Sequence, residues 1–306
     1  MNNHRYTLEP YNGTKTRYKC PNCEKVGQFT RYIDTQTSEH LNDAVGCCSR
    51  LIKCSYHYKP KQYFQDNNIS FDKTKSKPFV RKKSLPKPIT SFINDEVMQE
   101  SFSSKKPNLF LDFLTNIWDK EIADYLKVKY NIGTSNYWNG ATTFWLQDIN
   151  GNVRSGKIML YNPTNGKRIK KPYNHINWEH KTRKLENFNL KQCYFGEHLI
   201  NTDRSKPIAI CESEKTAIIS SVYLPEFIWL ACGSVNNLNE AKTRALKGRN
   251  VVLFPDLKCF DLWNDKIQQL TSLATFRTST LLEEKATAEE KEKGLDIADY
   301  LLNINY

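Results

Sequence analysis

The last third of the chain alternates short apolar runs with longer amphipathic segments. Each apolar run has the length of a strand, and each amphipathic segment has about the three turns of an ordinary helix. The predicted strands are residues 207–213, 227–233 and 250–256, and the predicted helices are residues 214–224, 238–248 and 260–270. This alternation is typical of a parallel, doubly wound sheet. Because the carboxyl ends of parallel strands meet at one edge, we expect Glu212, Gly233 and Asp256 to lie there together.

The region before these strands changes from a helical to a strand-like pattern. Residues 109–130 carry apolar side chains at i, i+3 and i+4 spacing, which predicts helix. Two β-prone runs follow, at residues 141–149 and 152–162, and Asn150-Gly151 separates them. An Asn-Gly pair between such runs is a strong hairpin signal. The pattern therefore predicts a mixed α+β subdomain.

The cysteines near the amino terminus are spaced like zinc ligands. The candidate ligands are Cys20 and Cys23, which form a C-x2-C pair, followed by Cys47, Cys48, Cys54 and His57. Zinc takes four sulfur or nitrogen ligands, and about 24 residues between two pairs leave room for a β-hairpin. The predicted ligands of a structural zinc ion are Cys20, Cys23, Cys48 and Cys54. His57 is the substitute ligand, and Cys47 is the weakest candidate because adjacent strand residues point to opposite faces. A set of buried free thiols is the alternative.

These features divide the chain into four parts of an α/β protein. Residues 67–104 are rich in Lys, Ser and Pro, which is typical of a linker, and a short helix is expected at its end. The predicted parts are a zinc ribbon (1–66), a basic linker (67–104), a basic α+β subdomain (105–202) and a parallel-sheet domain (203–306). Within the last part, residues 281–302 are interpreted as a charged surface stretch followed by a short amphipathic helix.

Positive charge is concentrated in the first two thirds of the chain. The net charge is +12, yet residues 203–306 hold 13 Lys and Arg against 15 Asp and Glu. The basic part would attract polyanions such as nucleic acid, and a solubilising surface is the alternative. No apolar run approaches the ~18 residues of a membrane span, and the first residues lack a signal-peptide core. We therefore expect a soluble, cytoplasmic protein with no membrane partner.

Glu212 and Asp256 would repel each other at the sheet edge unless a divalent cation lay between them. Mg²⁺ or Mn²⁺ is held by one or two carboxylates and water, and such an ion can neutralise phosphates and stabilise in-line displacement. Lys215, one helical turn after Glu212, would add a positive charge for phosphate. Glu214 is better explained as an amino-terminal helix residue that the helix dipole favours.

Four motifs of the last third resemble the TOPRIM domain of bacterial-type primases, topoisomerases and some nucleases. The motifs are IAICESEKTA at 208–217, the turn at Gly233, VVLFPD at 251–256 and GLDIADYLL at 294–302. In that family a Glu after the first strand and a D-x-D after the third bind catalytic metal. Glu212 matches the Glu and Asp256 the first Asp. Lys258 occupies the position of the second Asp, which leaves Asp261 or Asp296 to supply the missing oxygen.

The resemblance extends towards the amino terminus. Residues 125–138 and 144–162 are similar to the basic half of a primase catalytic core, and a ribbon precedes them. The order resembles small primase-like proteins of mobile genetic elements. It implies a nucleotidyltransferase that uses nucleoside triphosphates to synthesise short primers on single-stranded DNA during replication, with a replicative helicase as a further candidate partner. The alternatives are a DNA-binding accessory protein with a degenerate metal site, which Lys258 favours, and a TOPRIM nuclease.

Basic and aromatic side chains supply candidates for contact with DNA. The expected phosphate contacts are Arg31 in the ribbon and Arg154, Lys157, Lys167 and Arg168 in and after the hairpin. A solvated strand face is the alternative for these residues. Tyr137 and Trp138 could stack on bases, whereas Trp145 is expected in the core.

The remaining histidines and cysteines are expected to be structural. His175 and His180 have no paired cysteine or carboxylate at a catalytic spacing, and both are expected at the surface or at a cap. Four further cysteines are predicted to be small buried hydrophobic residues, namely Cys193, Cys211, Cys232 and Cys259.

Overall fold

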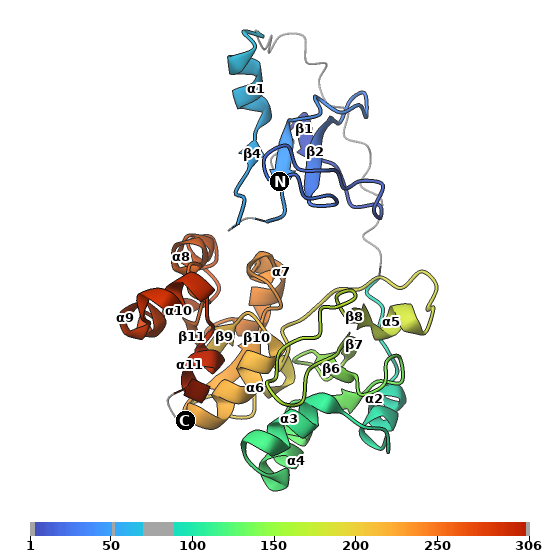
Figure 1. Ribbon diagram of the computed structural model, residues 1–306, viewed down its shortest axis with the longest axis vertical. Helices are drawn as coiled ribbons and strands as arrows, with labels where there is room; N and C mark the ends of the chain where they lie inside the picture. The colour runs from blue at the N-terminus through green and yellow to red at the C-terminus, as the bar shows by residue number, and fades with distance from the viewer. Residues whose placement is uncertain (1–3, 51–52, 70–88, 304–306) are drawn as a thin grey trace. The chain divides into compact units, whose positions relative to one another are not determined.

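A computed structural model describes residues 4–50, 53–69 and 89–303 (Figure 1). The chain divides into two compact units, Met1–Pro86 and Lys87–Tyr306. Each unit has a hydrophobic core of its own. Residues 70–88, half of the predicted linker, lie outside the described residues. Within the described ranges, no helix is both long enough and apolar enough to cross a bilayer.

The first unit is built on a small antiparallel sheet of four strands in the order β1-β2-β3-β4. Its elements are β1 (Tyr6–Leu8), β2 (Phe29–Asp34), β3 (Gly46–Cys48), β4 (His57–Tyr58) and the helix α1 (Pro60–Asp66). Phe29 is fully buried together with Cys20 and Cys48. Gly46 carries no side chain because the Phe29 ring and the Thr30 carbonyl occupy the place where a Cβ atom would stand.

The second unit contains an antiparallel sheet in the order β5-β6-β7-β8. Its strands are β5 (Ile132–Thr134), β6 (Thr142–Gln147), β7 (Val153–Met159) and β8 (Ile176–Trp178). The predicted hairpin is confirmed: β6 pairs with β7 across a turn in which Gly151 has φ +86°, a conformation that glycine adopts without strain. The helices around this sheet are α2 (Asp95–Phe102), α3 (Leu109–Ile117), α4 (Lys120–Lys129) and α5 (Glu179–Thr182).

The helical pattern over residues 109–130 corresponds to two helices rather than one. Helix α3 ends at Ile117, and the Asp119 side chain accepts a hydrogen bond of 2.8 Å from the Ile122 backbone N–H. Asp119 therefore caps a new helix, because a cap residue leaves the helical conformation and satisfies an amide that would otherwise have no partner. The apolar spacing continues through this break, so it does not show in the pattern.

A parallel sheet in the order β10-β9-β11-β12 completes the second unit. Its strands are β9 (Ile208–Cys211), β10 (Ile228–Ala231), β11 (Asn250–Leu253) and β12 (Thr275–Thr278). The helices around it are α6 (Glu214–Tyr223), α7 (Glu240–Thr243), α8 (Phe260–Ile267), α9 (Leu281–Lys285), α10 (Ala288–Lys293) and α11 (Ile297–Asn303). Helix α11 packs against α6, as Figure 1 shows.

One hydrophobic core runs through both sheets of the second unit. It includes Phe110 and Phe144 beside the antiparallel sheet and Trp229 in the parallel sheet, all fully buried. Tyr130 stacks on Phe195 with ring centroids 5.5 Å apart, and the Phe195 backbone pairs with Ala231 at the end of β10. The two sheets are therefore held in a fixed relation, because closely packed interiors resist displacement.

Candidate metal and nucleic-acid sites

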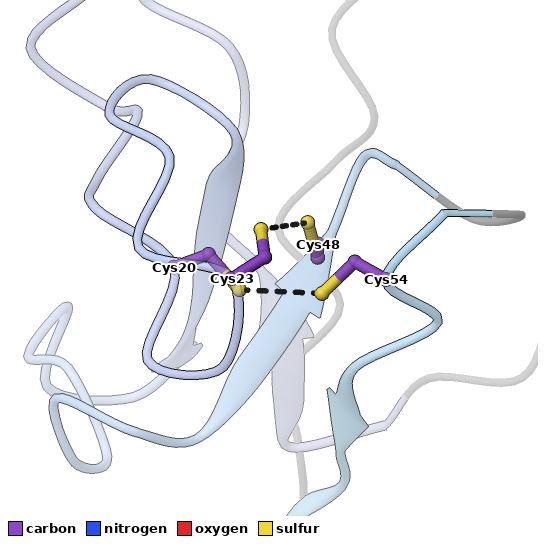
Figure 2. A group of neighbouring side chains, drawn as sticks. All are labelled: Cys20, Cys23, Cys48 and Cys54. Atoms are coloured by element: carbon purple, nitrogen blue, oxygen red, sulfur yellow. Dashed lines mark hydrogen bonds between the residues drawn. The ribbon is translucent and has the colours of Figure 1, made fainter.

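Four thiols of the first unit converge on one point. The Sγ atoms of Cys20, Cys23, Cys48 and Cys54 all lie within 4.8 Å of one another. Figure 2 shows the two closest pairs, Cys20 with Cys54 at 3.7 Å and Cys23 with Cys48 at 3.9 Å. A hydrogen bond from the Lys25 backbone lowers the pKa of the Cys23 thiol to about 6, which favours the thiolate that a metal requires. The four residues are those predicted as ligands.

Both alternative ligands point elsewhere. The Cys47 thiol is directed to the Cys48 carbonyl at 3.7 Å. The His57 Nε2 atom lies 2.9 Å from the Tyr32 hydroxyl, and the two rings stack with an interplanar angle of 7°. Four thiolates at tetrahedral spacing with no open position are the composition of a structural zinc site.

At the carboxyl edge of the parallel sheet, the structure brings together the strand ends that the sequence predicted. Glu212 directly follows β9, and Asp256 lies three residues after the end of the neighbouring strand β11. The Gly233 backbone N–H donates a 2.8 Å hydrogen bond to the Glu212 carbonyl, which joins the end of β10 to the same edge.

The carboxylates at this edge act on one another. Burial, followed by the negative charges of Asp296 and Glu212, raises the pKa of Asp256 to about 8. Burial also raises the pKa of Glu212, and the positive charges of Arg168 and Lys157 oppose that rise. Desolvated like charges that repel are stabilised when a divalent cation shares them. We call Glu212, Asp256 and Asp296 the acidic cluster.

The acidic cluster is not gathered around one point as the four cysteines are. Across residues 4–50, 53–69 and 89–303, the cysteine group alone places three or more metal-ligating atoms within 4.8 Å of one another.

Asp296 is held in place by the contact between α6 and α11. Thr216 Oγ1 donates a 2.6 Å hydrogen bond to Asp296 Oδ2, and Lys215 Nζ lies 3.2 Å from Asp299 Oδ1. The backbone amides of Asp296 and Asp299 each donate to the carboxylate of the other. The sequence reasoning named Asp296 but missed Asp299. The D-x-x-D spacing at the start of an amphipathic helix is the signal that could have found it.

Lys258 does not enter the acidic cluster. The backbone of Lys258 has φ +73°. The Lys258 Nζ atom donates a 2.8 Å hydrogen bond to the Glu292 carbonyl. Asp261, the other candidate for the missing oxygen, is exposed in the first turn of α8. Of the two candidates, Asp296 is the one whose charge acts on both Glu212 and Asp256.

Three of the five expected phosphate contacts are engaged in ion pairs. Arg154 pairs with buried Asp148 at 2.7 Å. Lys157 pairs with buried Glu214 at 2.8 Å, and the sequence reasoning did not anticipate this link between β7 and the start of α6. In the first unit, Arg31 pairs with Asp43 at 2.8 Å and lies over the Tyr18 ring. The remaining two, Lys167 and Arg168, are exposed in the loop after β7.

Several aromatic and sulfur-containing residues lie where expected, and one histidine does not. Trp145 is fully buried and donates to Ser101 Oγ at 2.8 Å. The cysteines at 193, 211, 232 and 259 are all buried. His180 was expected at the surface or at a cap, but this expectation is wrong, because His180 lies within α5 between the capping residues Trp178 and Arg183. It is 8% exposed, because it lies 2.9 Å from Ser155 Oγ and stacks on Phe188 with ring centroids 4.7 Å apart.

Family comparisons assign two segments of the chain. Residues 4–69 match the family described as a putative zinc beta-ribbon finger, and residues 108–257 match a domain of unknown function, DUF6371. The first match and the cysteine cluster together support a structural zinc site. No curated protein matches the chain.

Solved structures similar to the chain are primase domains from bacteria and a phage. The primase fragment of the bacteriophage T7 primase-helicase protein is 12% identical, with 91% of this chain and 98% of that chain covered and a TM-score of 0.38. The RNA polymerase domain of Mycobacterium tuberculosis primase DnaG is 10% identical over 65% of this chain and 80% of that chain, with a TM-score of 0.42. The zinc-binding and RNA polymerase domains of the Aquifex aeolicus primase are 9% identical over 96% and 82%, with a TM-score of 0.32.

Proposed function

We propose that the protein is a primase-like nucleotidyltransferase that synthesises short primers on single-stranded DNA, and that residues 203–306 form a TOPRIM domain. The observation that carries the proposal is the acidic cluster at the carboxyl edge of the parallel sheet. Open α/β sheets bind their ligands at this edge. Carboxylates on neighbouring strand ends are the ligands that Mg²⁺ and Mn²⁺ take in phosphoryl transfer.

Each residue of the site has a proposed role. Glu212 and Asp256 hold the cation, and Asp296 supplies the oxygen that Lys258 cannot. The cation would neutralise triphosphate charge and orient the phosphate that is attacked. Arg168 is exposed and its charge reaches Glu212, so it is placed to contact a phosphate there, with Lys167 beside it. The Lys215 ammonium lies 3.2 Å from the Asp299 carboxylate and balances its charge. Lys215 lies next to the carboxyl edge of the parallel sheet.

The ribbon and the basic residues define the proposed partners. The zinc ribbon, which carries Arg31 on its sheet, binds single-stranded template. Nucleoside triphosphates bind at the acidic cluster. A replicative helicase is a proposed partner as well. The excess of basic residues before residue 203 supports a polyanionic partner, since such an excess raises the rate of encounter with nucleic acid.

The test is primer synthesis by the full chain on single-stranded template, with labelled nucleoside triphosphates and Mg²⁺ or Mn²⁺. Short labelled products are expected, and they should disappear in Glu212→Gln and Asp256→Asn. Asp265→Asn, an exposed residue of α8, is the matched control and should leave product yield unchanged. A wild-type chain that binds template but yields no product with either metal would refute the proposal.

An accessory DNA-binding role is the second candidate. It is favoured by Lys258, which stands in place of a carboxylate and turns its ammonium to the Glu292 carbonyl. Template binding without product supports this role, whereas metal-dependent shortening of the template supports a nuclease.

A further inference from the structure

Four aromatic rings form a continuous row on two loops of the second unit. Tyr137 and Trp138 follow β5, and Tyr173 and His175 precede β8. Ring centroids are 4.6 Å apart from Tyr137 to Trp138, 5.1 Å from Trp138 to His175 and 4.5 Å from His175 to Tyr173. Tyr137 is 50% exposed and Tyr173 is 54% exposed. We call these four residues the aromatic row. Exposed rings that gather into one patch mark a binding site more often than rings exposed singly.

Tyr137, at one end of the aromatic row, also lines a cavity of about 300 Å³. The polar groups around the cavity include those of Ser101, Thr134, Ser135, Glu100, Glu179 and Arg183. Glu179 is buried, and its two oxygens accept from Thr143 at 2.8 Å and from Arg183 at 3.2 Å. Among the described residues, the Glu100 carboxylate has no hydrogen-bond or ion-pair partner. The cavity is at the small end of ligand pockets, and the exposed Glu100 carboxylate at its edge is available to accept a hydrogen bond.

The loop that carries half of the aromatic row also reaches the acidic cluster. It runs from the end of β7 to the start of β8 and contains Arg168, whose charge acts on Glu212. Tyr173 and His175 follow in the same loop. Lys170 and Lys171 are exposed between these two ends. His175 Nδ1 lies 3.1 Å from the Ile169 carbonyl, which folds the loop back on itself. The loop between the acidic cluster and the aromatic row therefore carries basic side chains along its length.

We propose that the aromatic row and the cavity beside Tyr137 form a binding site for single-stranded DNA, in which successive bases stack on the row and one base enters the cavity. The proposal rests on the proposed function, because it names the part of the second unit that holds the template. Single strands bind where exposed aromatic faces accompany a basic path for the backbone, and duplex DNA cannot offer its stacked base faces to such a row.

The donors and acceptors of the cavity indicate which base it takes. Carboxylates such as those of Glu100 and Glu179 only accept hydrogen bonds. Cytosine, adenine and guanine each offer an exocyclic amino group with two N–H donors, whereas an unpaired thymine offers only its single N3–H. The site therefore favours a base with an amino group over thymine at one position of the strand.

The test of stacking measures the affinity of the full chain for a labelled 12-nucleotide strand by fluorescence anisotropy. Tyr137→Leu combined with Tyr173→Leu removes two stacking faces and keeps apolar bulk. We expect affinity to fall at least about tenfold, because stacking on an aromatic side chain contributes roughly 1–3 kcal/mol per base. Tyr125→Leu in α4 is the matched control, since Tyr125 is 59% exposed and lies outside the aromatic row. Unchanged affinity in the double variant, or an equal loss in the control, overturns the proposal.

The test of the cavity compares an all-thymine strand with the same strand carrying one internal dC. The dC strand is expected to bind about tenfold more tightly, and Glu100→Ala should remove most of that preference. Glu226→Ala, an exposed residue far along the chain, matches the change in charge and should keep the preference. Equal binding of the two strands overturns the assignment of the cavity, and tighter binding of RNA or duplex of the same sequence overturns the assignment to single-stranded DNA.

The same variants separate this proposal from the proposed function. If primer synthesis is absent but binding depends on Tyr137 and Tyr173, the enzyme proposal fails and the binding site stands. If synthesis is present and depends on Glu212, while the affinity for single-stranded DNA does not depend on the aromatic row, the binding site fails and the enzyme proposal stands.

Discussion

Asp256→Asn is expected to stabilise the metal-free protein at pH 8 while abolishing its response to divalent cations. In the folded chain the pKa of Asp256 is raised to about 8, first by burial and then by Asp296 and Glu212. An unfolded chain releases that proton near pH 4. Between about pH 4 and pH 8 the folded state therefore holds a proton that the unfolded state has lost, and stability falls as pH rises through this range. Asparagine cannot ionise, so the variant does not suffer this loss.

The size of the effect follows from the shift in pKa. A rise of about 4 units at about 1.4 kcal/mol per unit gives a ceiling of about 5 kcal/mol at pH 8. Water penetration and relaxation around a desolvated carboxylate reduce the penalty, and we expect about 2 kcal/mol. For a unit the size of Lys87–Tyr306 this corresponds to a rise in Tm of roughly 6 °C.

Thermal unfolding of wild type and variant at pH 5 and pH 8, with chelator and with Mg²⁺, checks this prediction. The variant should exceed wild type at pH 8 and match it at pH 5, and Mg²⁺ should raise the Tm of wild type alone. Asp265→Asn, at an exposed position of α8, is the matched control. A difference in Tm between Asp256→Asn and wild type that does not depend on pH would refute the reasoning.

Three further predictions concern other parts of the chain. One zinc ion per chain is expected by elemental analysis, and both chelation and Cys20→Ser should unfold the first unit, whereas Cys47→Ser should retain the metal. Lys157→Gln leaves buried Glu214 unpaired and should lower the free energy of unfolding, measured by denaturant titration, by about 3–5 kcal/mol. Adding Glu214→Gln to this variant should recover much of that loss. Losses that simply add in the double variant would contradict a direct ion pair. Lys258→Val should lower stability by about 1–2 kcal/mol, since a β-branched residue is strained at φ +73°, while Lys258→Gly should not; equal Tm values for the two variants would contradict the strain.

The sequence was most informative where one periodicity extended over a whole element. The three apolar strands before Glu212, Gly233 and Asp256 were predicted at their positions along the chain, because a fully buried parallel strand shows as an unbroken apolar run. Strand β12 was not predicted, since Thr275–Thr278 is short and half exposed and has no such run. The predicted helix at 238–248 became a four-residue helix, α7, followed by a 3-10 turn at Arg244–Leu246.

Individual side-chain partners were harder to predict than positions. The four cysteines could be chosen because metal spacing is local and because Cys47, next to Cys48 on a strand, points to the opposite face, whereas His57 remained open as a substitute. Lys157 and Glu214 lie 57 residues apart, and only the packing of β7 against α6 brings them together. The burial of His180 depends in the same way on Phe188 and Ser155, which reach it through the tertiary fold. Charge and aromatic content indicated the region that we propose binds nucleic acid, but they could not assign a partner to each residue.

The position of α11 has a consequence for the order in which the molecule matures on the ribosome. Glu212 and Asp256 follow strands β9 and β11, which are synthesised before α11, whereas Asp296 arrives with α11 and is held by a hydrogen bond from Thr216 of α6. Synthesis proceeds at about 5–20 residues per second, so the nascent sheet exists for some seconds with only two of its three acids. An incomplete chain released in that interval would lack one of the three carboxylates that we propose bind the cation.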